Sequence, residues 1–147
     1  MAVIKPTLTL TSNASTAGTD PGPLSVALSL SATDSLTVDS VKAATLAVSA
    51  TEATLFDGSA EGTAGTGGTV GGFVYLKNTS TTAARLVHIG IVADDGSAAD
   101  LVQSGDVARL FTLKVGEFAF FPFDYTMDIT VDADGAGTLE YWLFDRG

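Results

Sequence analysis

The sequence contains no cysteine and a single histidine, His88. The absence of cysteine excludes a disulfide framework and a thiolate zinc site. His88 lies between apolar residues of a predicted strand, so we expect a hydrogen-bonded packing residue rather than a catalytic base. Neither a second histidine nor a Gly-x-Ser-x-Gly nucleophile motif accompanies it. We therefore expect a protein that is not an enzyme and that needs no cofactor or metal.

Charged residues are also scarce, and basic residues most of all. They make up 16% of the chain, against about 25% in ordinary soluble domains. Lys and Arg number 7 and Asp and Glu number 17, for a net charge of −10. Nucleic acids and anionic membrane surfaces are bound through Lys and Arg, so we expect neither as a partner. A chain with so little charge hides part of its surface against neighbours, which predicts a homo-oligomer or an assembly subunit.

Long apolar runs, helical periodicity and targeting signals are missing as well. No run approaches the roughly 18 apolar residues of a membrane helix. The N-terminal residues, interrupted by Lys5 and Pro6, do not form a signal peptide, so we expect a cytosolic product. Residues 57–72 are dense in glycine but lack the Gly-Lys-[Ser/Thr] of a phosphate-binding loop, and they predict a surface loop. The Asp132–Gly135 segment lacks the spacing of an EF-hand calcium loop and predicts a hairpin turn.

The dominant pattern is the period-2 alternation of β-strands. It is clearest where Leu24, Val26, Leu28 and Leu30 alternate with serine and alanine. Similar segments recur with turn residues between them and predict about eight to ten strands and no helix. We therefore predict an all-β fold, an antiparallel β-sandwich with a jelly-roll-like topology. We expect residues 1–23 to form an N-terminal arm and linker, and residues 24–147 to form a single sandwich domain.

The stretch Val107–Tyr125, which holds five of the 8 phenylalanines, predicts a β-hairpin with its turn at Lys114–Glu117. Two registers fit this turn, and both place the same residues on one face because they differ by two residues. The predicted core face carries Phe111, Leu113, Phe118 and Phe120. The opposite face is too apolar for a plain solvent surface and carries Leu110, Thr112, Ala119, Phe121 and Phe123.

The last predicted strand, Thr138–Arg146, is apolar on both faces too, since Leu139, Tyr141 and Leu143 alternate with Trp142 and Phe144. Such a strand is either central in a sandwich or packed against another subunit. The candidate interface residues are therefore Leu110, Phe121, Phe123, Trp142 and Phe144. They can form a second core layer, a subunit interface or an aromatic platform for a sugar ring. Few polar residues are available to hydrogen-bond a sugar on such a platform, because Gln103 is the single glutamine and asparagine occurs only at positions 13 and 78.

Three segments of the second half carry a family resemblance. They are Phe73-Val-Tyr-Leu-Lys-Asn78, Leu113-Lys-Val-Gly-Glu-Phe-Ala-Phe-Phe-Pro122 and Leu139-Glu-Tyr-Trp-Leu-Phe144. Together and in this order they resemble the small β-rich virion structural proteins of tailed bacteriophages. The resemblance covers residues 70–147 and includes no catalytic motif.

This resemblance implies a jelly-roll-like structural subunit of the capsid decoration (cement) type. Such a subunit stabilises the phage head by burying interface area, as a homotrimer seated on the major capsid protein. Its location would be the virion surface, after synthesis in the host cytoplasm. The alternative is a glycan- or receptor-binding β-domain of a phage tail or fibre.

Overall fold

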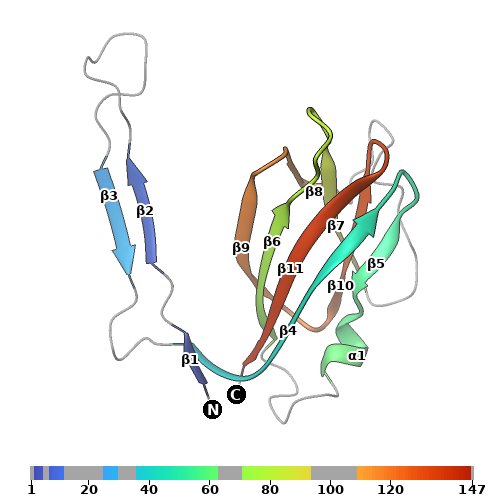
Figure 1. Ribbon diagram of the computed structural model, residues 1–147. Coiled ribbons are helices and arrows are strands. Elements are labelled where there is room, and N and C mark those ends of the chain that lie inside the picture. Colours follow the sequence, from blue (N-terminus) through green and yellow to red (C-terminus); the bar gives the residue numbers. More distant parts are fainter. Residues whose placement is uncertain are drawn as a thin grey trace. The chain divides into compact units, whose positions relative to one another are not determined.

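The computed structural model describes residues 2–4, 7–11, 25–29, 36–62, 71–93 and 109–146. These residues fall into two compact units, Met1–Val38 and Asp39–Gly147. Strands dominate both units, with one short helix, and the fold is all-β as predicted (Figure 1).

The first unit contains a two-stranded antiparallel sheet of β2 (Thr7–Thr11) and β3 (Ser25–Ser29). Leu8 lies opposite Leu28 in this sheet, and β1 (Ala2–Ile4) pairs with the start of β4 (Leu36–Val48). The alternation from residue 24 therefore does form a strand, but its partner is β2 and not a strand of the sandwich. The two units divide after Val38 rather than before residue 24. The expected linker at residues 12–23 lies outside the described residues.

The second unit is a sandwich of two antiparallel sheets, and its remaining elements follow in chain order. They are β5 (Ala53–Phe56), α1 (Gly58–Gly62), β6 (Gly72–Asn78), β7 (Val87–Ala93), β8 (Arg109–Leu113), β9 (Phe118–Phe123), β10 (Met127–Ala133) and β11 (Gly137–Arg146). One sheet has the order β4-β11-β6-β9, with β1 added beside the start of β4, and the other has the order β5-β10-β7-β8. The glycine-rich segment begins as α1, and its residues 63–70 are not among those described.

This strand order is that of a jelly roll, which confirms the predicted fold class. β4 is adjacent to β11, β5 to β10, β6 to β9 and β7 to β8. The chain thus runs out through four strands and returns through the next four, each returning strand lying beside its mirror partner. As a consequence, every connection in the sandwich except that between β7 and β8 passes from one sheet to the other.

The predicted hairpin over residues 107–125 is wrong for this reason. β8 pairs with β7 and β9 pairs with β6, so the Lys114–Glu117 corner joins two different sheets. Gly116 supplies the positive φ of this corner, at 84°. Phe118, predicted as core, is 59% exposed, whereas Phe123, predicted on the opposite face, is 3% exposed.

The core lies between the two sheets and is built from both. Leu76, Leu139 and Leu143 come from the first sheet, and Ile89, Ile129 and Val131 come from the second. Every one of these side chains is at most 1% exposed. Aromatic rings fill one part of this layer, where Phe56 contacts both Phe123 and Tyr141 with ring centroids 6.1 and 5.3 Å apart.

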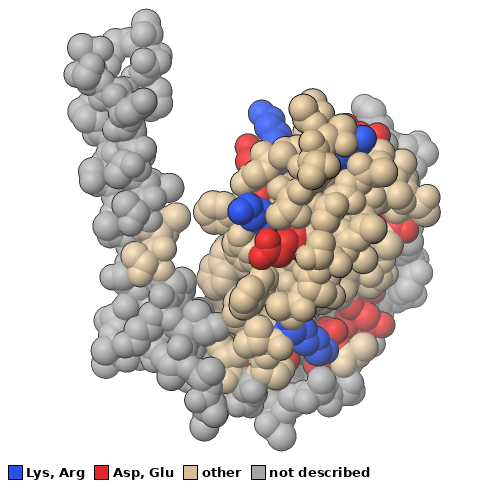
Figure 2. All heavy atoms as spheres, in the orientation of Figure 1, with Lys and Arg blue, Asp and Glu red and all other residues tan. Residues whose placement is uncertain are grey.

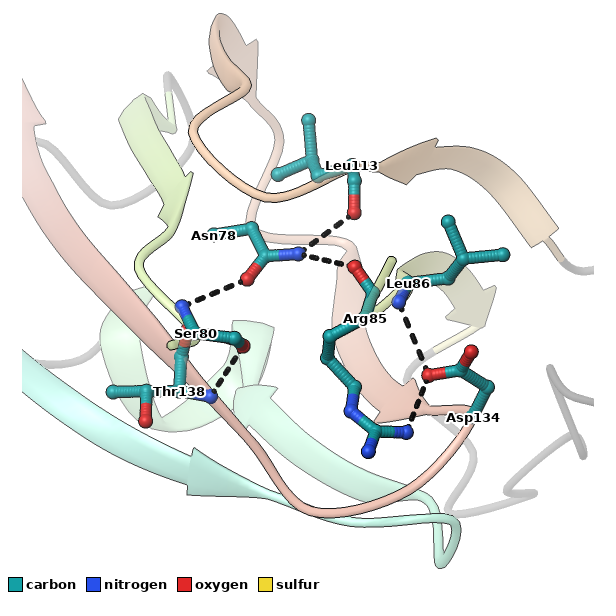
Figure 3. A network of polar contacts seen from close by, with 7 residues as sticks. All are labelled: Asn78, Ser80, Arg85, Leu86, Leu113, Asp134 and Thr138. Atoms are coloured by element: carbon teal, nitrogen blue, oxygen red, sulfur yellow. Dashed lines mark hydrogen bonds and ion pairs between the residues drawn. The ribbon is translucent and has the colours of Figure 1, made fainter. Parts of the chain in front are cut away.

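Asn78, at the end of β6, holds three segments together from a fully buried position (Figure 3). Its side-chain nitrogen donates to the carbonyl oxygens of Arg85, at 3.0 Å, and Leu113, at 2.9 Å. Its side-chain oxygen accepts from the backbone of Ser80 at 3.1 Å, and its own N–H donates to the Glu117 carbonyl at 3.0 Å. These bonds tie the β8–β9 corner to β6 and so determine where β9 begins alongside it.

Asp134 makes a second polar anchor in the turn between β10 and β11 (Figure 3). Its carboxylate accepts from the Arg85 guanidinium at 2.8 Å and from the Leu86 N–H at 3.0 Å. The Arg85 hydrogen bond, followed by the Leu86 bond, lowers the pKa of the Asp134 carboxyl. The predicted hairpin turn at Asp132–Gly135 is also wrong, because β10 and β11 belong to different sheets.

Candidate functional site

His88 occupies a buried position on β7, with 5% of its surface exposed. Its Nδ1 lies 2.9 Å from the Thr112 hydroxyl on β8, which is the hydrogen-bonded packing role that the sequence predicted. Burial, together with the nearby charge of Arg109, lowers the pKa of His88. Within the described part of the chain, no cluster of three or more acidic or histidine side chains is arranged to hold a metal ion.

The most unusual surface is the outer face of β9, β6 and β11. Val74 and Leu76 of β6 and Leu143 of β11 are buried in the core, so the residues that alternate with them face outward. The strand register arranges them in three rows, each read from β9 through β6 to β11. The rows are Pro122–Phe73–Phe144, Phe120–Tyr75–Trp142 and Phe118–Lys77–Glu140. We refer to these residues as the aromatic face.

The six rings of the aromatic face contact one another in a group of four and a neighbouring pair. Three pairs are stacked: Phe73 with Phe120 at 5.7 Å and 7°, Tyr75 with Phe118 at 6.0 Å and 30°, and Trp142 with Phe144 at 6.0 Å and 27°. An edge contact between Phe120 and Phe144, at 6.3 Å, joins two of these pairs. The rings stay partly open to solvent, and Phe118, Trp142 and Phe120 are 59%, 41% and 39% exposed.

Charge on the aromatic face is limited to one row, where Lys77 lies directly opposite Glu140. The Trp142 indole N–H donates to a Glu140 carboxylate oxygen at 3.1 Å. Burial and the charge of Glu140 raise the pKa of Tyr75, so its hydroxyl stays neutral. Figure 2 shows the same face in space-filling form, and the surface over β11, β6 and β9 is mainly uncharged. One Lys and one Glu cancel, although the whole chain carries −10.

One buried carboxylate holds the far end of this sheet. Asp145 of β11 is 3% exposed, and it accepts hydrogen bonds from the hydroxyls of Ser40 on β4 and Tyr125 in the β9–β10 connection. Burial and the Asp145 hydrogen bond raise the pKa of Tyr125. These bonds fix β11 between its neighbours, so the outward rings stand on a sheet secured at both ends.

The structure separates the five predicted interface residues. Trp142 and Phe144 lie together on the aromatic face. Leu110 is 53% exposed but belongs to β8 in the other sheet. Phe121 and Phe123 turn inward, where Phe123 is part of the core and Phe121 packs against it. Of the alternatives considered for these two residues, the second sheet of the same chain is therefore the one that covers them.

Sequence reasoning missed four of the six aromatic residues of the aromatic face. The hairpin prediction assigned Phe118 and Phe120 to the core, and Phe73 and Tyr75 were not assigned to either face of a sheet. The alternation of Phe73 and Tyr75 with Val74 and Leu76 is the signal that identifies them. It becomes decisive only once β6 is known to lie between β9 and β11.

No protein-family model matches this chain, and no significant match was found among curated proteins or solved structures. Within the residues that the structure describes, no helix is long and apolar enough to cross a membrane.

Proposed function

We propose that this protein is a non-enzymatic structural subunit of a bacteriophage virion, of the capsid decoration type. The observation that carries the proposal is the exposed aromatic face. Contiguous exposed apolar surface of this kind is typical of protein–protein contact sites, whose central residues are enriched in Trp, Tyr and Phe. The phage context comes from the sequence resemblance of residues 70–147.

The geometry of the rings favours a protein partner over a sugar. A sugar platform needs ring faces turned to solvent, whereas stacked pairs turn ring faces toward each other. In the most nearly parallel pair, Phe73 and Phe120, the planes differ by only 7°. The polar groups that would orient a sugar are also few, since Lys77 and Glu140 are the charged residues of the face and Glu140 already accepts from Trp142. The side chains of a protein partner, by contrast, can pack between the rings and contact the exposed ring edges as well as the ring faces.

A decoration subunit acts by burying surface and needs no chemistry. Stable contacts between proteins bury about 800 Å² on each partner, with a few central aromatic residues supplying most of the binding energy. In this proposal the subunit, a homotrimer according to the resemblance, binds the major capsid protein of the assembled shell. The acidic remainder of the surface keeps the unbound subunit soluble.

The test is binding to phage shells that lack this protein, measured by co-sedimentation and by electron-microscopy localisation. The wild-type chain is expected to bind saturably. A Phe118→Ser/Trp142→Ser double variant is expected to bind at least about tenfold more weakly, because it removes the two most exposed rings of the aromatic face. Leu110→Ser is the matched control, since Leu110 is as exposed as these residues but lies on the other sheet.

A folded wild-type protein that ignores shells would refute the proposal. Specific hits on a glycan array, lost in the same double variant, would instead establish the glycan-binding alternative.

A further inference from the structure

We infer that the aromatic face is covered by the aromatic face of a second copy of this chain, in a twofold face-to-face contact. The inference rests on the proposed role as an assembly subunit, because it names the protein that covers the face. The twofold axis lies midway between the two facing sheets. It runs parallel to the strands, over the line that separates β6 from β11.

The order of the sheet supports this position of the axis. Of the four sandwich strands in this sheet, which follow the order β4-β11-β6-β9, the central ones are β11 and β6; β1 pairs with the start of β4. An axis between them places β11 over β6 of the partner, and β9 over β4 of the partner. Each of these four strands is then covered, and the exposed rings of β9 lie over a strand that carries Val41, which is 46% exposed. An axis over any one of these strands would leave one or more of the four without a facing strand.

The charges of the aromatic face select the same axis. Lys77 and Glu140 are directly opposite each other on β6 and β11. The axis between these strands therefore places Lys77 over the partner's Glu140 and Glu140 over the partner's Lys77, giving two symmetric ion pairs. An axis over β6 would place Lys77 against the partner's Lys77. The two ion pairs recorded among the described residues are Lys42–Glu61 and Arg85–Asp134, so neither engages Lys77.

The aromatic rings complete the match. Tyr75 and Trp142 belong to the middle row. The same axis places Tyr75 over the partner's Trp142, and Trp142 over the partner's Tyr75. Facing sheets pack about 10 Å apart, a spacing that interdigitated ring edges fill. The aromatic face has no net charge, so two acidic chains can approach through it without bringing like net charges together.

The area predicts a weak contact. Strands are about 4.8 Å apart and rise about 3.3 Å per residue, so four strands over the length of β6 present a footprint of about 440 Å². Stable interfaces bury about 800 Å² per partner, and smaller ones are transient. We therefore expect an association that reverses on dilution, which leaves the aromatic face of the free subunit available for the shell contact proposed above.

The test is a charge exchange between two variants, read by light scattering after size exclusion and by analytical ultracentrifugation over a dilution series. Lys77→Glu and Glu140→Lys each place like charges opposite each other across the axis, so each alone is expected to associate at least about tenfold more weakly than wild type. An equimolar mixture of the two variants restores both attractions and is expected to form a heterodimer. Circular dichroism of each variant verifies that it is folded.

Trp142→Ser and Leu110→Ser complete the design. Trp142→Ser is expected to halve the mass, and Leu110→Ser is expected to leave it unchanged. A twofold contact gives an even number of subunits, namely a dimer, or a hexamer if the trimer implied by the resemblance also forms through another surface. Failure of the charge-exchanged mixture to associate, or an unchanged mass in Trp142→Ser, overturns the inference.

The outcomes separate this inference from the proposed function. Association without shell binding supports the twofold contact and refutes the decoration role. Shell binding that Trp142→Ser abolishes, in a chain whose mass never depends on the aromatic face, supports decoration and shows that the shell is the occupant.

Discussion

Removal of the Asn78 side chain, at the end of β6 beside the β8–β9 corner, is predicted to destabilise the sandwich strongly. The side chain makes three hydrogen bonds, at 2.9, 3.0 and 3.1 Å, to backbone groups of Leu113, Arg85 and Ser80. Each such bond contributes a net of about 1 kcal/mol, and a buried group left without a partner costs about 1–3 kcal/mol. Asn78→Ala is therefore expected to lower the free energy of unfolding by about 3–5 kcal/mol, a large share of the stability of a typical domain.

The assay is urea unfolding followed by circular dichroism, with Thr81→Ala as the control at an exposed position of the same connection. The control is expected to change the free energy of unfolding by less than about 0.5 kcal/mol. A second variant, Asn78→Asp, keeps the oxygen that accepts from Ser80 but turns a carboxylate oxygen toward two carbonyl groups. It is expected to be as destabilising as alanine, and to recover in part under acidic conditions, where a protonated carboxyl donates one hydrogen bond.

The reasoning is refuted if Asn78→Ala loses less than about 1 kcal/mol. That result would mean that the carbonyls of Arg85 and Leu113 find other partners, and that the β8–β9 corner does not depend on Asn78 for its position.

The remaining predictions concern the core, one titrating group and two backbone positions. Phe123→Ala is expected to cost about 3–5 kcal/mol of unfolding free energy, whereas Phe118→Ala changes it by less than about 1 kcal/mol, and equal losses would contradict the assignment of faces. Burial lowers the pKa of His88 below its ordinary 6.5, so the unfolded chain binds the proton more readily than the folded chain. The contribution of His88 to the free energy of unfolding is therefore constant above pH 6.5 and decreases as the pH falls from 6.5 to the pKa of the folded state. Denaturation over a pH series is expected to show a smaller loss of stability in His88→Gln than in the wild type. Gly71→Ala is expected to cost at least about 2 kcal/mol in urea unfolding, because Gly71 has a φ of 71° and an added Cβ would overlap the Phe123 carbonyl oxygen. Ala84→Gly is expected to raise the melting temperature, since Ala84 holds a φ of 64° that costs a residue with a Cβ about 1 kcal/mol.

Local patterns predicted the elements of this protein well. Alternation located β11, and it placed Leu139 and Leu143 on one face and Trp142 on the other, as the structure shows. The same pattern located β7, and it placed His88 in a buried, hydrogen-bonded position. These successes share a cause, since the direction of a side chain along one strand depends only on its neighbours in the chain.

The candidate site was predicted less completely. Trp142 and Phe144 were identified because both faces of one strand were apolar, a property visible within a single segment. Phe121 and Phe123 were equally apolar candidates, but they belong to the core layer. An apolar residue on a strand must be covered, and the sequence pattern does not show whether the cover comes from the same chain.

The composition and alternation of this sequence were sufficient for the all-β class and for most strands. Which sheet each strand joins was decided only by the tertiary structure. A glycine corner such as Lys114–Glu117 serves a hairpin and a crossing between sheets equally well, and the difference depends on β9 pairing with β6, about forty residues earlier in the chain. That long-range pairing turns Phe118 outward and brings it beside Tyr75, and it places both on the same face as Trp142. The aromatic face is thus assembled from three distant segments, and no local pattern in any one of them contains it.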